Sequence, residues 1–180
     1  MSLLRRDILK KINLNKVIII FLLTLVGCSG SEERPEYRER SLASIYNNAV
    51  YNLERGRVQQ AAFEFDEVER QHPYSSWARR SMLMSAYAYY LQNKYDQAIS
   101  TAQRFISLHP GNKNAVYAYY LIAQSYYERI QDVARDQRIT ELALESFVEV
   151  IRRYPETDYA KDSQMKVDLT QDHLAGKEMY

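Results

Sequence analysis

From residue 41 onward, apolar and polar positions alternate with the period of a helix, and almost none of the chain shows the two-residue alternation of a strand. This pattern predicts three consecutive pairs of helices and one further helix behind them. The expected ranges are 41–55 with 57–72, 75–92 with 95–109, 113–131 with 138–153, and a last helix from about residue 157.

The predicted pairs repeat along the chain. Pro73, Pro110 and Pro155 each end the second helix of a pair, because proline cannot continue the helical hydrogen-bond ladder. The first two prolines are 37 residues apart and the last two 45 apart, and the extra eight residues fall in the polar segment 131–138. Alanines recur at matching places in both helices of every pair: Ala49, Ala61, Ala86, Ala98, Ala123 and Ala143.

A unit of this length with alanine, an aromatic residue and proline in its second helix resembles the tetratricopeptide repeat. The first pair carries these residues as Ala61, Phe65 and Pro73, and the third pair matches it. The middle pair differs, with Ala102 in the aromatic place and Phe105 one turn later.

We therefore predict an all-α fold over residues 41–180, a right-handed superhelix of tetratricopeptide-like helix pairs (an α-solenoid) with three helix pairs and an unpaired helix. Gly56 and the Asn93–Lys94 step stand at turns inside pairs, where positive φ is often required. The polar last helix is either a cap or a sign that the chain is incomplete at Tyr180, and we favour the second interpretation. An unrelated antiparallel bundle is the alternative fold.

The most apolar run lies outside the repeat, at residues 17–26, behind a basic segment. Ten residues at ~1.5 Å each cover about half of a ~30 Å hydrocarbon core, which is too short for a transmembrane helix. The run ends in LVGC at Cys28 and resembles a bacterial lipoprotein signal. We predict a signal peptide at 1–27, then a lipidated Cys28 with a flexible tether at 28–40. A plain secretory signal followed by a free thiol is the alternative.

This predicted signal accounts for the positive net charge of the chain. It carries five basic residues and one acidic residue, so its removal changes the net charge from +1 to about −3. No run of lysine and arginine remains to bind nucleic acid. Cys28 is the single cysteine, so no disulfide can form within the chain.

The sequence shows no pattern of catalytic or metal-binding residues. His72 and His109 precede prolines at equivalent repeat places, and His173 lies on the polar last helix, so no metal-ligand spacing appears. Five glycines leave no phosphate-binding loop, and the carboxylates of helix 57–72 are typical of a solvated face. We predict no catalytic, cofactor or metal site and no enzyme activity. A lipid-anchored cell-wall hydrolase, the enzymatic alternative, would need a separate catalytic domain.

The sixteen tyrosines are concentrated on the first helices of the second and third pairs. First helices line the concave surface of such stacks, and tyrosine offers large contact area with a hydroxyl that tolerates water. We predict a groove that binds a peptide or partner, lined by Tyr46, Val50, Arg80, Tyr87, Tyr90, Tyr117, Tyr120, Gln124 and Tyr127. Tyr89 and Tyr126 are expected to face the core. The alternative is that about half of these tyrosines pack between repeats.

Several segments together resemble the BamD (ComL/YfiO) family of lipoproteins. The matching segments are residues 61–74, 88–90, 95–99, 104–110, 135–137, 150–155 and 173–178, of which 104–110 (RFISLHP) is the most specific.

That resemblance implies a non-enzymatic periplasmic scaffold of the outer-membrane β-barrel assembly complex, anchored to the outer membrane through Cys28. Ser29 after the cysteine resembles the sorting pattern for outer-membrane delivery. The implied partners are the POTRA region of the barrel assembly subunit BamA, companion lipoproteins, and C-terminal targeting segments of unfolded outer-membrane proteins. Family members carry further repeats that contact BamA, whereas this chain ends inside its fourth. A generic lipid-anchored tetratricopeptide adaptor for other envelope proteins is the alternative.

Overall fold

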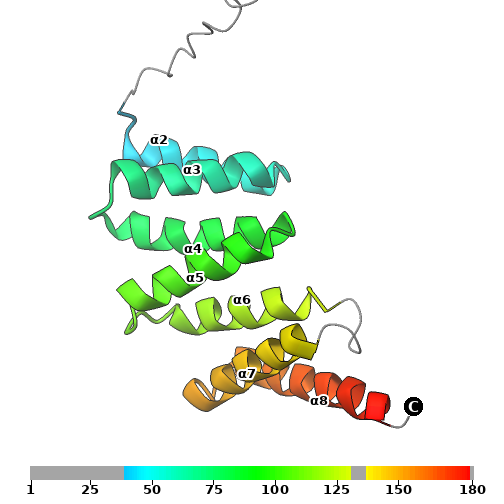
Figure 1. The fold of residues 1–180 in the computed structure, drawn as a ribbon. Helices are drawn as coiled ribbons and strands as arrows, with labels where there is room; N and C mark the ends of the chain where they lie inside the picture. Colours follow the sequence, from blue (N-terminus) through cyan, green and yellow to red (C-terminus); the bar gives the residue numbers. More distant parts are fainter. Residues whose placement is uncertain (1–38, 131–136, 179–180) are drawn as a thin grey trace, which may run out of the picture. The chain divides into compact units, whose positions relative to one another are not determined.

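The computed structural model describes residues 39–130 and 137–178. In this part of the chain seven α-helices follow one another down a stack (Figure 1). They are α2 (Leu42–Glu54), α3 (Val58–Gln71), α4 (Ser76–Leu91), α5 (Tyr95–Leu108), α6 (Ala115–Tyr127), α7 (Gln137–Arg153) and α8 (Asp158–Glu178). Each predicted helix is present within a few residues of its expected ends. The predicted signal peptide, Cys28 and most of the tether lie outside the described residues.

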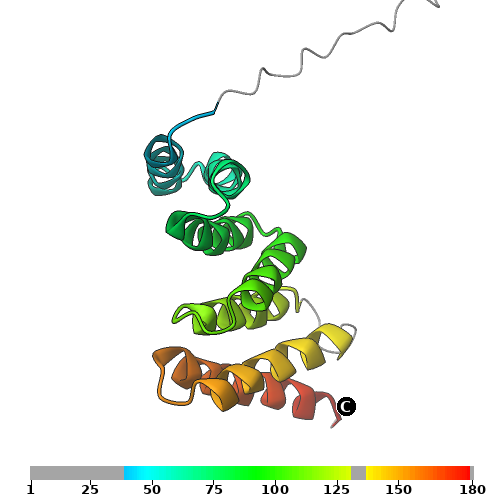
Figure 2. The same cartoon turned by 90° about the vertical axis from the view of Figure 1, so that its left-hand side faces the viewer.

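Each helix packs against the helices before and after it in the chain. The first helices α2, α4, α6 and α8 also contact one another in order, so they form one side of the stack. In Figure 2, α2 and α3 are seen end-on while α7 lies across the view, which shows that the pairs turn relative to one another. The prediction of an all-α stack of helix pairs is confirmed. None of the described helices is long and apolar enough to cross a membrane.

The backbone repeats as closely as the sequence does. His72 and His109 end α3 and α5 with φ/ψ of −132°/54° and −136°/53°. The N–H groups of His72, His109 and Tyr154 each donate a 2.9 Å hydrogen bond to the carbonyl four residues earlier. Gly56 has φ 70° and Asn93 has φ 58°, so the prediction of positive φ at these turns is confirmed.

Small side chains let paired helices approach closely. All six repeat alanines have an exposed fraction of 0%. Larger residues fill the layers around them, which include one cluster on α2 and α3, one on α4 to α6 and one that joins α6, α7 and α8. The alanine pattern therefore sets the spacing of the helices in each pair.

The middle pair exchanges the order of a large and a small core residue. The first pair buries Phe65 and, three residues later, Val68, whereas the middle pair buries Ala102 and then Phe105. Compared with the first pair, the phenylalanine of the middle pair lies one turn later, and alanine occupies the position that phenylalanine has in the first pair. This compensation keeps the core filled although the middle pair departs from the repeat pattern.

Arg40, at the end of the predicted tether, is bound to α3. Its backbone N–H donates to Gln71 Oε1 at 2.8 Å, and its guanidinium pairs with the Glu64 carboxylate at 2.8 Å. Its carbonyl oxygen lies 2.9 Å from His72 Nε2. The helical unit accordingly begins at Glu39.

Candidate functional site

Tyrosine rings from three helices form a continuous series. The Tyr87 ring of α4 lies 6.4 Å from that of Tyr117 of α6, centroid to centroid. Tyr117 in turn lies 5.7 Å from Tyr159 of α8, and Tyr159 lies 5.1 Å from Tyr120 of α6. We use the name tyrosine surface for these rings with their neighbours: Tyr87, Tyr90, Tyr117, Tyr120, Tyr127 and Tyr159.

Helical spacing explains why these side chains share one side of the stack. Tyr117, Tyr120, Gln124 and Tyr127 recur at intervals of three and four residues, which places them on one face of α6. Because α6 contacts both α4 and α8, equivalent faces of these helices follow one another along the stack. The sequence therefore brings together rings that are more than 40 residues apart.

The hydroxyl groups of the tyrosine surface are partly anchored. The Tyr120 hydroxyl donates a hydrogen bond to Asp162 of α8 at 2.6 Å, and the Tyr90 hydroxyl lies 3.3 Å from Glu128. Burial is the main cause that raises the pKa of Tyr90, to about 12, and it also raises the pKa of Tyr117 and Tyr120. These phenols are therefore neutral at physiological pH and keep their protons for hydrogen bonding.

The remaining positions on α6 complete this face. Gln124 is half-buried, and its Oε1 atom has no hydrogen-bond partner among the described residues. The ammonium group of Lys166 lies 4.7 Å from the centre of the Tyr127 ring, a cation–π contact from α8. The face thus offers apolar area with a few polar groups at its margin.

The first pair contributes less than expected. Tyr46 is only 7% exposed and lies edge-on to Phe65 at 5.8 Å and to Trp77 at 4.5 Å, so it belongs to the core. Val50 packs against the same core cluster. Arg80 is exposed, and its guanidinium carbon lies 5.9 Å from the centre of the Tyr46 ring. The tyrosine surface therefore starts at α4.

The structure also places Tyr89 and Tyr126 away from this face. The Tyr89 hydroxyl donates to Asp66 of α3 at 2.6 Å, and Ser85 donates to the same carboxylate. Tyr126 packs against the core cluster of α4 to α6. Tyr87, Tyr90 and Tyr117 touch that cluster too while they remain partly exposed, so they combine packing with surface contact.

Three residues of α8 extend the tyrosine surface although the tyrosine pattern of the sequence did not predict them: Tyr159, Asp162 and Lys166. The helix is polar, and its pattern gave no reason to assign it to the groove. A signal was present in the repeat, because Tyr159 follows Pro155 at the same interval at which Trp77 follows Pro73. Trp77 covers Tyr46 just as Tyr159 covers Tyr120.

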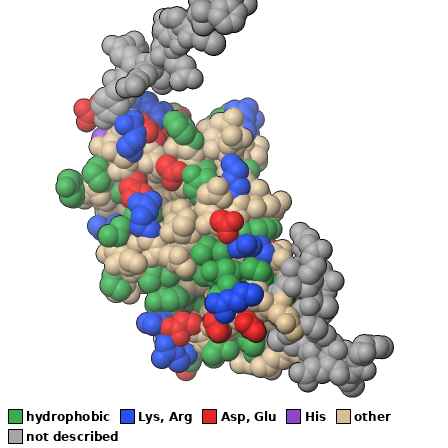
Figure 3. All heavy atoms as spheres, in the orientation of Figure 1, with side chains coloured by type: hydrophobic (Ala, Val, Ile, Leu, Met, Phe, Trp, Pro, Cys, Tyr) green, Lys and Arg blue, Asp and Glu red, His purple; other side chains and the backbone are tan. Residues whose placement is uncertain are grey.

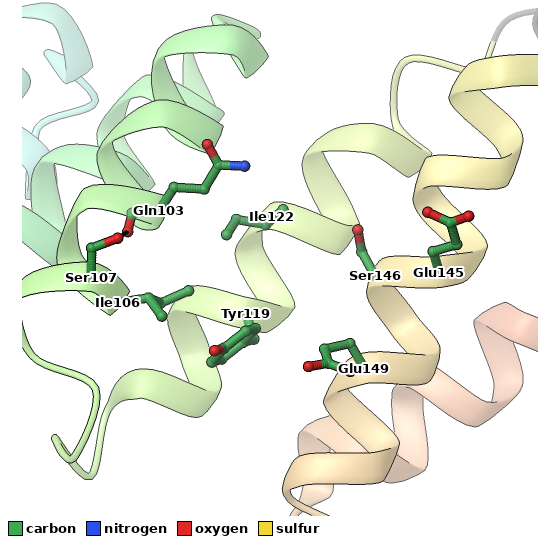
Figure 4. Close-up of a pocket in the computed structure, with 8 residues that line it drawn as sticks. All are labelled: Gln103, Ile106, Ser107, Tyr119, Ile122, Glu145, Ser146 and Glu149. Atoms are coloured by element: carbon green, nitrogen blue, oxygen red, sulfur yellow. Dashed lines mark hydrogen bonds between the residues drawn. The ribbon is translucent and has the colours of Figure 1, made fainter.

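A hollow lies on another side of α6, between α5 and α7. Its volume is about 630 Å³, and Ile106, Tyr119 and Ile122 line its apolar part (Figure 4). Glu145 and Glu149 stand at its margin on α7. In the space-filling view, hydrophobic side chains gather in the lower part of the stack beside charged ones (Figure 3). We use the name outer hollow for the space between α5 and α7 that these residues line.

Neither surface has the residues of a metal centre. Within residues 39–130 and 137–178, no three His, Cys, Asp or Glu side chains gather in a way that could hold a metal ion. The chemistry that the tyrosine surface offers is contact with apolar and aromatic groups, together with hydrogen bonds from neutral phenols.

Comparison with known proteins agrees with this fold. A tetratricopeptide repeat domain of Arabidopsis OM64 superimposes with a TM-score of 0.55 at 12% sequence identity, and covers 71% of this chain and 93% of that domain. This likeness concerns the fold alone, and it supports the predicted tetratricopeptide-like architecture.

Sequence relatives are considerably closer. The outer membrane protein assembly factor BamD of Caulobacter vibrioides is 48% identical over 163 residues, which are 89% of this chain and 53% of that protein. BamD of Rickettsia prowazekii is 39% identical over 171 residues, 95% of this chain and 68% of its own length. The chain thus spans about half the length of the Caulobacter relative. Both relatives are named as assembly factors, in agreement with the expectation of a non-enzymatic protein.

The sequence model of one family covers the whole helical unit. That family is described as YfiO, outer membrane lipoprotein, and it matches residues 38–180. The match starts where the described helical unit starts and includes every helix of the tyrosine surface. With these matches, the chain belongs to the YfiO (BamD) family of outer membrane lipoproteins.

Proposed function

We propose that this protein is a scaffold of the outer-membrane β-barrel assembly complex, held at the outer membrane by lipidated Cys28 and facing the periplasm. Its partners in this proposal are the POTRA region of the barrel assembly subunit BamA, companion lipoproteins and targeting segments of unfolded outer-membrane proteins. The name of the relatives, outer membrane protein assembly factor, supports this role.

The tyrosine surface is the observation that carries the binding of unfolded segments. Successive rings are 5.1 to 6.4 Å apart along α4, α6 and α8. In an extended chain, side chains on one face are about 6.8 Å apart, since each residue rises ~3.4 Å. Every second side chain of an extended segment can therefore contact a successive tyrosine ring. Aromatic side chains of the segment gain most from such contacts.

Lipid attachment at Cys28 would strengthen this binding without new contacts. Acyl chains keep the tyrosine surface close to the membrane at which barrel proteins assemble, so a modest intrinsic affinity suffices. Replacement of Cys28 by alanine is expected to release the protein from membranes, which fractionation of cell envelopes measures. Continued retention of the alanine variant in the membrane fraction would contradict lipid attachment.

The alternative of a generic lipid-anchored adaptor for other envelope proteins predicts the same fold and the same cellular location. It differs only in the partners that the protein binds. Affinity purification of the tagged full-length protein from detergent-solubilised envelopes separates the two proposals. We expect a stoichiometric POTRA-containing barrel protein, identified by mass. Recovery of other envelope proteins in its place would favour the adaptor.

Purified protein tests the tyrosine surface itself. A variant with Tyr87→Ala and Tyr159→Ala should weaken binding of a peptide from the C-terminal strand of a barrel protein by about ten-fold or more, given contacts of ~0.5–1.5 kcal/mol each beyond area burial. Tyr74→Ala is the matched control, because Tyr74 is 99% exposed in the turn before α4. Equal peptide affinity of the double variant and the control would contradict the proposed site.

A further inference from the structure

A small basic pocket opens between the start of α4 and the loop that precedes α6. Its volume is about 210 Å³. The residues around it are Ser76, Arg79, Arg80, Phe105, Asn112, Lys113 and Asn114. Buried Phe105 contributes an apolar part, and every charged residue in this lining is a cation. We use the name basic pocket for this site.

The positive charge of the basic pocket is uncompensated. Arg79, Arg80 and Lys113 make no ion pair with any residue that the structure describes, and the guanidinium of Arg80 lies near the Tyr46 ring. Elsewhere in the stack, some arginines pair with a carboxylate of another helix, as Arg104 does with Glu69. The first turns of α4 and α6 contain no acidic residue, so their helix dipoles add to the positive potential.

The basic pocket lies close to the tyrosine surface on the same helices. Tyr117 follows Asn114 of the pocket by one turn of α6, and its ring lies 6.4 Å from that of Tyr87. Tyr87 follows Arg80 by two turns of α4, a rise of about 10 Å. An extended peptide covers about 10 Å with three residues.

We infer that the basic pocket binds a carboxylate of the extended peptide that occupies the tyrosine surface. The carboxylate is placed about three residues along the peptide from an apolar side chain in contact with Tyr87 and Tyr117. Guanidinium groups hold carboxylates with paired, charge-assisted hydrogen bonds, and Arg79 has its donors free for this among the described residues. This inference rests on the proposed function and adds to it a preference for acidic segments.

Peptide continuity favours a peptide carboxylate over the phosphate of an anionic lipid. A ligand that fills the tyrosine surface passes within a few residues of the basic pocket, so its carboxylate is already at a high effective concentration there. A lipid headgroup would need a separate binding event at a cavity of only about 210 Å³.

Two labelled, amidated hexapeptides test the inference with the full-length protein in detergent. One carries aspartate at its last position, three residues after phenylalanine, and the other carries asparagine in place of the aspartate. We expect the aspartate peptide to bind about ten-fold more tightly by fluorescence anisotropy, as charge-assisted hydrogen bonds imply. Arg79→Gln with Lys113→Gln should remove this difference and leave the affinity for the asparagine peptide unchanged. Arg80 is retained because it also contacts Tyr46.

Lys94→Gln is the control. It makes the same lysine-to-glutamine change as at Lys113, but at an exposed residue at the start of α5, outside the basic pocket. This variant should keep the full preference for aspartate. Equal affinity of the native protein for both peptides, or a preference that survives the double variant, would overturn the inference and leave the tyrosine surface in place.

Two other outcomes would also overturn it, and they differ in what they say about the proposed function. If neither peptide binds, the tyrosine surface fails as a peptide site and the inference fails with it. If the peptides bind equally while the double variant loses flotation with phosphatidylglycerol vesicles, the basic pocket binds lipid phosphate.

Discussion

The Tyr120 hydroxyl donates a 2.6 Å hydrogen bond to the Asp162 carboxylate and so joins α6 to α8 across the tyrosine surface. The Tyr159 ring lies 5.1 Å from Tyr120 on the same side. At the equivalent place of the first pair, Trp77 lies 4.5 Å from Tyr46 but buries it. The same repeat position thus serves packing at one end of the stack and a partly open surface at the other.

Removal of this hydroxyl should loosen α8. We expect Tyr120→Phe to lower the free energy of unfolding by about 1 kcal/mol, because the carboxylate loses its phenol donor while the ring stays packed. Urea denaturation measures the change. Tyr119→Phe is the matched control, since the Tyr119 hydroxyl has no hydrogen-bond partner in the described part of the chain. Equal stability of the two variants would show that the Tyr120–Asp162 bond contributes nothing measurable.

Half-buried phenols should make the stack sensitive to alkali. Burial, with the neighbouring Asp66, raises the pKa of Tyr89 from its ordinary value of 10.0 to about 12. Between these two pH values the unfolded chain loses the Tyr89 proton, whereas the folded chain keeps it. The contribution of this phenol to the free energy of unfolding is therefore fully present below about pH 10, and it is lost as the pH rises toward about 12. Tyr89→Phe should reduce this slope in urea denaturation between pH 9 and 12. Tyr74→Phe, at an exposed position, should leave the slope as it is.

The exchanged core residues of the middle pair should depend on each other. Ala102→Phe alone overfills the core, and Phe105→Val alone leaves a cavity, so each should destabilise by about 1–3 kcal/mol. The double variant restores the order found as Phe65 and Val68 in the first pair. We expect it to cost clearly less than the sum of the single variants in thermal or urea denaturation. Additive losses would mean that the two sites do not share one space.

The two turns inside pairs should respond oppositely to substitution. Gly56→Ala should destabilise by about 1 kcal/mol, although nothing lies within 4 Å of the added methyl group, because φ is +70° there. Asn93→Gly should be neutral or slightly stabilising at φ 58°. Thermal denaturation compares them. A harmless alanine at Gly56 would show that the turn can adopt another conformation at no cost.

The helix pairs were predictable because their signals are local and repeated. Pro73 and Pro110 mark equivalent helix ends, and the alanines mark where backbones approach, so periodicity alone determined pairs and turns. The burial of Tyr46 was not predictable in this way, because it depends on Trp77 of the next pair folding over its ring. The contribution of Tyr159 was missed for a related reason, since its role appears only once α8 is placed beside α6.

Side-chain hydrogen-bond networks and charged pockets could not be predicted from the repeat pattern of the sequence. The sequence pattern predicts that Asp66 lies on a solvated face. In the structure its carboxylate accepts hydrogen bonds from Ser85 and Tyr89 of the next pair. The basic pocket joins Arg79 to Lys113, which belong to different helix pairs. Such sites arise from how consecutive repeats are turned against each other, and repeat spacing alone does not specify that rotation.

The central claim is that the tyrosine surface holds unfolded outer-membrane proteins, and site-specific photo-crosslinking in intact cells tests it most directly. A photoreactive phenylalanine is placed at Tyr87 or Tyr159, with controls at exposed Tyr74 and at Gln103 of the outer hollow. We predict crosslinks to newly made barrel proteins from positions 87 and 159 and none above background from the controls. Crosslinks from the controls alone, or equally from all four positions, would contradict the assignment.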